Sequence, residues 1–167
     1  MKRPSPPYHI LCIEDNPGDV ELIREALSEF PVAHELSTVS NGIDALAFLR
    51  APGGSADLIL LDLNLPRMDG REVLGQLKND PTLRHIPVEV ITSSKAERDL
   101  LQTYQSYANC YVAKPVDLHE FLTVVQEVAK FWLLRAKLPP RLEQSDETRE
   151  WDVVGETNNK SITDRRQ

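Results

Sequence analysis

Four apolar runs of this chain end in side chains that suit metal and phosphate chemistry. In chain order, the four ends carry Glu14-Asp15, Asp62, Thr92-Ser93 and Lys114. If the runs are parallel strands, their carboxyl ends share one edge of a sheet. Three carboxylates, two hydroxyls and an ammonium would then lie close together. This combination predicts a site for a divalent cation and a phosphoryl group.

Asp62 is the candidate nucleophile of this site. Carboxylates held close together repel one another, which raises the pKa of one of them unless a cation neutralises the cluster. Hard oxygen ligands with this charge favour Mg²⁺ or Mn²⁺, which bind through few carboxylates plus a phosphate. A metal-bound Asp62 would attack phosphorus in line and form an aspartyl phosphate. Because phosphoryl transfer needs mainly positioning and charge neutralisation, the metal ion and Lys114 would supply most of the catalysis.

Length and composition exclude several other classes of protein. A chain of 167 residues fits one domain with an extension, and its 27% charged and 41% hydrophobic residues are typical of a soluble globular protein. The net charge of -7 disfavours nucleic acid as a partner. With no signal peptide and no segment long enough to span a bilayer, we expect no membrane contact and a cytoplasmic location. Cys12 and Cys110 lie inside apolar runs, which favours buried thiols over a disulfide.

Alternating strands and helices must position the candidate site. The expected strands cover residues 8–13, 36–39, 58–61, 88–91 and 110–113. Helices are expected after each strand: one begins at Pro17, short ones lie around 45–49 and 73–77, a weakly amphipathic one covers 96–107, and Asp117 caps the last.

Five strands alternating with five helices imply an α/β fold, a doubly wound five-stranded parallel sheet covered on both faces. Because crossovers are right-handed, the flavodoxin-like strand order 2-1-3-4-5 is the leading topology. Its switch point lies between the first and third strands, which end in Glu14-Asp15 and Asp62. Topology and residue type therefore predict the same site.

The chain divides into three segments. Residues 1–7 are rich in proline and are expected to form a flexible N-terminal arm, residues 8–134 the folded domain, and residues 135–167 a C-terminal arm or disordered tail. The end of the final helix is apolar on all sides, because four large apolar residues follow one another: Phe131, Trp132, Leu133 and Leu134. Such a run needs a second partner, so we expect a homodimer interface there. The alternative is that the chain's own end covers this part of the helix.

The site residues resemble the receiver domain of two-component response regulators over roughly residues 8 to 130. Glu14-Asp15 matches the acidic pair of that family, with Glu in place of the commoner first Asp. The resemblance implies that Asp62 is the phosphoacceptor. It also implies that Glu14, Asp15, Asp62 and the Asn64 carbonyl hold the metal ion.

The same resemblance assigns the remaining groups. Thr92 matches the hydroxyl and Lys114 the lysine that bind the phosphoryl group, with Ser93 beside them, and Tyr111 matches the aromatic switch position. After phosphorylation Thr92 is expected to move inward and Tyr111 to turn into the space it leaves. The surface expected to switch is formed by the helix over 96–107, the strand over 110–113 and the final helix.

Further motifs resemble a subfamily, the single-domain regulators that partner bacterial phytochromes. These motifs are the runs over 14–19, 63–66 and 91–94 and the apolar helix end at 131–133. The resemblance implies a sensor histidine kinase, a bacteriophytochrome, as the phosphodonor or phosphatase.

Three other functions are compatible with parts of the sequence. The leading interpretation is a phosphoacceptor that acts on no external substrate and is not an enzyme in that sense. The alternative is a metal-dependent phosphatase or phosphotransferase with an aspartyl-phosphate intermediate, but such enzymes typically have an acid at the position of Asn64. A transcription factor needs a folded DNA-binding module for which the tail has no room. A scaffold that only dimerises would leave the site groups unexplained.

Overall fold

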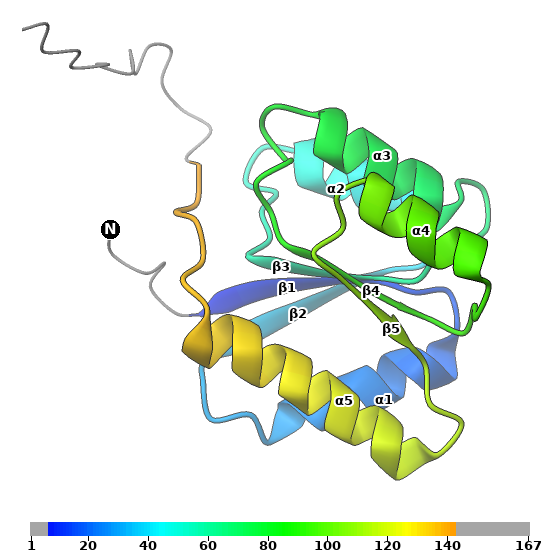
Figure 1. The fold of residues 1–167 in the computed structure, drawn as a ribbon. Helices are drawn as coiled ribbons and strands as arrows, with labels where there is room; N and C mark the ends of the chain where they lie inside the picture. Colours follow the sequence, from blue (N-terminus) through cyan, green and yellow to red (C-terminus); the bar gives the residue numbers. More distant parts are fainter. Residues whose placement is uncertain (1–6, 143–167) are drawn as a thin grey trace, which may run out of the picture.

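A five-stranded parallel sheet forms the centre of the computed structural model, which describes residues 7–142 (Figure 1). Its order is β2-β1-β3-β4-β5. The strands are β1 (Tyr8–Ile13), β2 (His34–Val39), β3 (Leu58–Leu61), β4 (Val88–Thr92) and β5 (Cys110–Ala113). The predicted fold class and strand order are confirmed. The predicted start of the second strand was two residues late, because all of β2 pairs with β1, beginning with His34 opposite Tyr8.

Five α-helices cover the sheet: α1 (Pro17–Ser28), α2 (Gly42–Arg50), α3 (Gly70–Asn79), α4 (Glu97–Gln105) and α5 (Leu118–Lys130). Figure 1 shows α1 and α5 on one face and α2, α3 and α4 on the other. Side chains of Asn16, Asn41, Asp69 and Asp117 accept backbone hydrogen bonds at the first turns of α1, α2, α3 and α5. α4 instead begins after Ala96, which has no side-chain acceptor, and it ends before Tyr107, whose φ of 64° is left-handed.

The core consists of two apolar clusters, one on each face of the sheet. Along β1, Leu11 and Ile13 join the cluster under α2 and α3, whereas Ile10 and Cys12 join the cluster under α1 and α5. This alternation follows from the two-residue period of a strand. Because both faces are covered, the central strands are nearly continuous apolar runs. Both cysteines are free thiols, as expected.

Strand register brings the ends of the central strands into line. Ile13 at the end of β1 pairs with Leu61 at the end of β3, and the Asp62 amide donates to the Ile13 carbonyl at 3.0 Å. On the other side, Thr92 pairs with Ala113, and the Lys114 amide donates to the Thr92 carbonyl at 2.7 Å. The residues that follow these strands therefore emerge at one edge of the sheet. No helix within residues 7–142 has the length and apolarity needed to cross a membrane.

The chain after α5 packs back onto its own domain, which differs from the expected boundary at residue 134. A π-helical turn covers Phe131–Arg135, and Leu133 and Leu138 are both buried in the core cluster under α1 and α5. Arg141 then pairs with the buried carboxylate of Asp57 at 2.6 Å and donates to the Pro7 carbonyl. The folded unit thus continues at least to Arg141. Residues 1–6 and 143–167, which hold most of the expected arm and tail, lie outside the described residues.

Arg141→Ala should lower the free energy of unfolding. It removes the charged partner of Asp57, whose side chain is 2% exposed, although the Arg141 side chain itself is 31% exposed. A loss of about 1–2 kcal/mol is expected, because the buried carboxylate keeps only weaker hydrogen-bonding partners. Urea denaturation measures the change, with Lys137→Ala, an exposed cation of the same segment, as the matched control. Equal stability of the two variants would contradict the role of this ion pair.

Candidate phosphoryl and metal site

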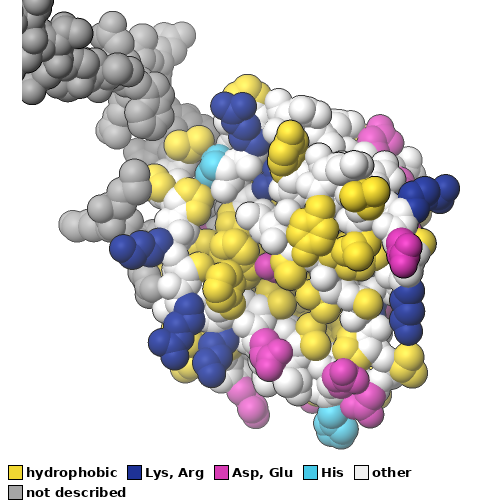
Figure 2. Space-filling model, in the orientation of Figure 1, with side chains coloured by type: hydrophobic (Ala, Val, Ile, Leu, Met, Phe, Trp, Pro, Cys, Tyr) yellow, Lys and Arg dark blue, Asp and Glu magenta, His cyan; other side chains and the backbone are white. Residues whose placement is uncertain are grey.

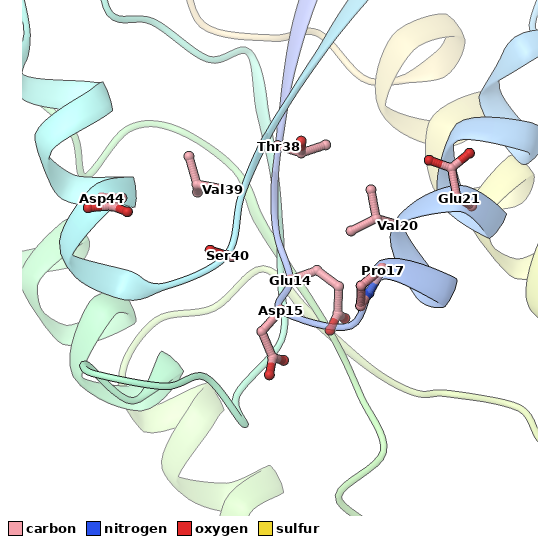
Figure 3. Close-up of a pocket in the computed structure, with 9 residues that line it drawn as sticks. All are labelled: Glu14, Asp15, Pro17, Val20, Glu21, Thr38, Val39, Ser40 and Asp44. Atoms are coloured by element: carbon pink, nitrogen blue, oxygen red, sulfur yellow. The ribbon is translucent and has the colours of Figure 1, made fainter.

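Three carboxylates meet at the edge of the sheet where β1 and β3 end. Oxygen atoms of Glu14, Asp15 and Asp62 all lie within 4.8 Å of one another. Glu14 and Asp62 are buried, whereas Asp15 is exposed. Figure 3 shows Glu14 and Asp15 side by side at the end of β1, next to the start of α1. The prediction that these strand ends converge is confirmed.

The local sequence holds each acid in place. The Asn16 amide donates to Glu14 at 3.0 Å, and the Asn64 amide donates to Asp62 at 3.2 Å. α3 approaches the Asp62 backbone so closely that a Cβ at Gly70 would lie 2.2 Å from the Asp62 carbonyl oxygen. Only glycine tolerates this contact. The tight approach fixes the loop after β3, and with it the direction in which the chain leaves Asp62.

Beside these acids lies a cleft of about 420 Å³ that is open to solvent. Glu14, Asp15 and Pro17 border it on the side of β1 and α1, and Thr38, Ser40 and Asp44 border it on the side of β2 and α2. Figure 3 shows the Asp44 and Glu21 side chains at its two outer margins. The cleft therefore leaves the Glu14 and Asp15 side of the cluster open to solvent from this direction.

Lys114 links the acids across the sheet. Its ammonium lies 2.6 Å from Glu14 Oε2, 2.8 Å from Asp19 Oδ2 and 3.1 Å from Asp62 Oδ2, and its side chain is 10% exposed. An ammonium has three N–H donors, so these three carboxylates are enough to satisfy it. Burial disfavours the charge, but the hydrogen bonds to Asp19 and Glu14 outweigh it and raise the Lys114 pKa above its ordinary value. Lys114 is therefore positively charged at the point where a phosphoryl group would arrive.

For Glu14, hydrogen bonds do not outweigh the effect of burial on the pKa. The pKa of this carboxyl is raised to about 7, chiefly by burial and in addition by the nearby negative charge of Asp62. The hydrogen bonds from Lys114 and the Asn16 amide offset this rise only in part. A divalent cation would reverse this effect, because a positive charge favours the ionised carboxylate. Clustered carboxylates, once ionised, are a donor set that fits Mg²⁺ or Mn²⁺.

The remaining predicted site residues occupy different environments. Thr92 is fully buried at the end of β4, and its hydroxyl oxygen accepts from the Ser94 amide at 3.4 Å. Ser93 is exposed on the loop that follows, and Asn64 is exposed beyond β3. The roles predicted for Thr92, Ser93 and the Asn64 carbonyl stay predictions.

Tyr111 is part of a polar chain that sequence reasoning missed. Its hydroxyl donates to the Ser94 carbonyl at 2.7 Å, and the Ser94 hydroxyl donates to Asp99 in α4 at 2.5 Å. Arg71 from α3 pairs with the same Asp99 carboxylate at 2.5 Å, and these bonds lower the Asp99 pKa. The loop after β4 is therefore tied to α3, α4 and β5. Each acid or base here reads in the sequence as an ordinary surface charge near a helix start, so no signal singles it out.

The four residues predicted for a dimer interface divide between surface and core. Phe131 is 54% exposed, Trp132 and Leu134 are half-buried, and Leu133 is buried in the domain's own core. Including Leu133 in an interface was therefore wrong, because the π-helical turn points this side chain inward. Phe131 and Trp132 line a mainly apolar groove of about 520 Å³ together with Cys110 and Val128.

The fold and the site are those of a phosphoacceptor domain, and a family comparison agrees. The family model for the response regulator receiver domain matches residues 10–126. The match spans more than half of the sequence, and the chain belongs to this family. The resemblance seen in the sequence is confirmed.

Individual relatives extend the likeness over nearly their whole length. The response regulator Rcp1 of Synechocystis sp. is 41% identical over 140 residues, which cover 81% of this chain and 95% of Rcp1. The structure of Mn²⁺-bound Rcp1 superposes with a TM-score of 0.77 at 40% identity, covering 80% of this chain and 99% of that one.

Two further solved structures are of phytochrome response regulators. The phosphorylated cyanobacterial regulator RcpA has a TM-score of 0.77 and 45% identity, over 79% of this chain and 98% of RcpA. The bacteriophytochrome response regulator AtBRR has a TM-score of 0.60 and 41% identity, over 75% of this chain and 94% of AtBRR. The predicted resemblance to the regulators that partner phytochromes is confirmed.

Metal affinity should rise with pH around neutrality. Below the Glu14 pKa of about 7 the cation must displace a proton, and above it the carboxylate is already ionised. Between about pH 6 and pH 8 we expect a roughly tenfold gain in Mg²⁺ affinity, measured by calorimetric titration. Glu14→Gln should abolish this gain, whereas Asp44→Asn, at the margin of the cleft, should keep it. A pH-independent affinity of the unaltered protein would contradict the prediction.

Proposed function

We propose that this protein is a single-domain response regulator that accepts a phosphoryl group on Asp62 from a sensor histidine kinase. The observation that carries the proposal is the Lys114 ammonium, which lies 3.1 Å from Asp62 and also contacts Glu14 and Asp19, each of these acids being buried or half-buried. A lysine and a carboxylate nucleophile held this close provide attack and charge neutralisation at one point.

The proposed reaction uses few protein groups. Glu14, Asp15, Asp62 and the Asn64 carbonyl would hold Mg²⁺ or Mn²⁺, which neutralises charge on the phosphoryl oxygens. An Asp62 oxygen forms the new bond to phosphorus while the bond from phosphorus to the donor nitrogen breaks. Lys114 pairs with a phosphoryl oxygen, and the Thr92 and Ser93 hydroxyls donate to the others. No external substrate is turned over, in keeping with Asn64 at the position where related phosphatases typically have an acid.

The output surface that we propose is formed by α4, β5 and α5. α4 buries only two side chains, Asp99 and Thr103, and exposes three large apolar ones, Leu100, Leu101 and Tyr104, with the exposed Tyr107 following just beyond its end. Figure 2 shows hydrophobic side chains gathered on the face that these three elements share. An element with so little apolar contact to the core shifts at low cost. The Thr92 and Tyr111 side chains connect it to the site, because both bond to Ser94.

The proposed kinase is a bacteriophytochrome, and the proposed location is the cytoplasm. Support comes from the likeness to RcpA and AtBRR, which are phytochrome and bacteriophytochrome response regulators. The net charge of -7 supports a protein partner rather than nucleic acid. We also propose a homodimer in which a second copy covers the groove that Phe131 and Trp132 line beside β5 and α5.

Asp62→Asn should abolish acid-labile phosphorylation by acetyl phosphate and Mg²⁺. The amide lacks the negative charge that attacks phosphorus, so labelling should fall to background. Phosphate-affinity electrophoresis with and without acid treatment measures this. Asp44→Asn, a neighbouring acid that borders the same cleft, should be labelled at the rate of the unaltered protein. Full labelling of the Asp62 variant would refute the assigned phosphoacceptor.

Phe131→Glu should shift the protein toward the monomer. A carboxylate buried against Trp132 and Val128 of a second copy would cost more than the contact gains. Mass by light scattering after gel filtration at micromolar concentration measures the state. Ile43→Glu, which makes the same change at an exposed site on α2 on the other face, should leave the mass unchanged. If the unaltered protein already has the mass of a monomer, the proposed assembly is wrong.

A further inference from the structure

Asp19 contacts Lys114 but lies outside the group of acids that could hold the metal ion. Its Oδ2 is 2.8 Å from the Lys114 ammonium, whereas the metal-binding group contains only Glu14, Asp15 and Asp62 among the described residues. We propose that Asp19 is a positioning residue for phosphoryl transfer, holding the Lys114 ammonium beside Asp62 throughout the reaction. This inference rests on the function proposed above.

Lys114 would lose some of its hydrogen-bonding partners during the reaction but would keep Asp19. Before it, Glu14, Asp19 and Asp62 each accept one hydrogen bond from the ammonium. A bound cation would draw the oxygens of Glu14 and Asp62 toward itself, and phosphorylation would convert one Asp62 oxygen into the bridging oxygen of an acyl phosphate. Asp19 is then the one carboxylate of the three that neither event removes. It can keep Lys114 aimed while the ammonium gains a phosphoryl oxygen.

The backbone of Asp19 is held rigidly at the start of α1. It lies in the first turn of α1, where the Asn16 side chain accepts from the amides of Gly18 and Asp19 and Pro17 occupies the first helical positions. The helix start therefore fixes the backbone from which this carboxylate extends. Its charge is also favoured there by the helix dipole.

The ion pair between Lys114 and Asp19 is largely buried. An exposed ion pair contributes little, since water competes for both partners. Here the Lys114 side chain is 10% exposed and that of Asp19 is 26% exposed. The pair is thus largely shielded, and the Lys114 ammonium has few other groups to turn to. Its position should depend measurably on Asp19.

The test compares two substitutions at this position under saturating Mg²⁺. Asp19→Ala removes the acceptor, and the rate of phosphorylation by acetyl phosphate should fall about tenfold, the effect of losing about 1.4 kcal/mol. Asp19→Asn keeps an oxygen that can accept from Lys114, and it should stay within about threefold of the unaltered rate. Glu25→Ala, which removes an exposed acid of the same helix, is the control and should have no effect. An unchanged or faster rate for Asp19→Ala, or an Asn variant as slow as the Ala variant, would overturn the proposal.

A double-mutant cycle decides whether Asp19 acts through Lys114. In a Lys114→Met background, Asp19→Ala should change the rate by less than about twofold, because the group it positions is gone. Additive losses would show that Asp19 acts in another way. Mg²⁺ affinity of Asp19→Ala should stay within about threefold of the unaltered value, although its rate falls about tenfold. A loss of affinity as large as the loss of rate would make Asp19 a metal ligand and overturn the proposal.

One readout is independent of activity. In ¹H–¹⁵N spectra, a Lys114 ammonium held by three carboxylates should give a slowly exchanging signal that Asp19→Ala broadens or removes and Glu25→Ala preserves. Persistence of this signal in Asp19→Ala would count against the proposal. If the unaltered protein is not phosphorylated on Asp62, the proposed function fails; if it is, and Asp19→Ala matches it in rate and spectrum, only the inference about Asp19 fails.

Discussion

Repulsion among buried carboxylates is the constraint on which this site depends. Glu14 and Asp62 are 4% and 5% exposed, and with Asp15 their oxygens lie within 4.8 Å. Such a group is stable only when protons or cations balance it. In the structure the balance comes from Lys114 and from a Glu14 pKa raised by burial to about 7. The same imbalance makes the site receptive to a divalent cation, and then to the phosphoryl group that the cation accompanies.

Strand order and register are what bring those charges together. Glu14 and Asp62 follow paired residues of β1 and β3, and Lys114 follows a residue paired with the end of β4. Apolar side chains hold both faces of the central strands, so the ends of those strands cannot move apart without opening the core. Stability therefore comes from residues that have no part in the chemistry. The acids that destabilise the edge are supported by the packing beneath them.

A second polar group, next to the site, provides a physical route from the site to the surface. Asp99 accepts from Arg71 and Ser94, and the Ser94 carbonyl accepts from Tyr111. These bonds join the loop after β4 to three other elements, while α4 itself makes little apolar contact with the core. In the function proposed above, a change at Thr92 would reach α4 through a few hydrogen bonds rather than through repacking of a large interface. That arrangement suits an element with two positions of similar free energy.

Sequence patterns predicted the class of fold and the strand order, and they predicted that Glu14, Asp15, Asp62 and Lys114 would meet at one edge of the sheet. Apolar runs have a strong period, and the residue types at their ends have few chemical uses in combination. The sequence did not predict the contacts that Asp19, Arg71 and Asp99 make. Acids such as Asp19 and Asp99 are common in the first turn of a helix, where the dipole favours them, and a surface arginine is equally ordinary. The neighbouring sequence does not show that Asp19 contacts Lys114, which lies 95 residues away along the chain.

The segment that follows α5 also differs between what the sequence predicted and what the structure shows. Four consecutive apolar residues from Phe131 indicated a surplus of apolar surface, but they could not indicate which side chain the domain would bury. The structure was needed to show that Leu133 and Leu138 enter the core while Phe131 stays exposed. The physical reason is that burial depends on the path of the whole chain, here a π-helical turn and the return of Arg141 to Asp57.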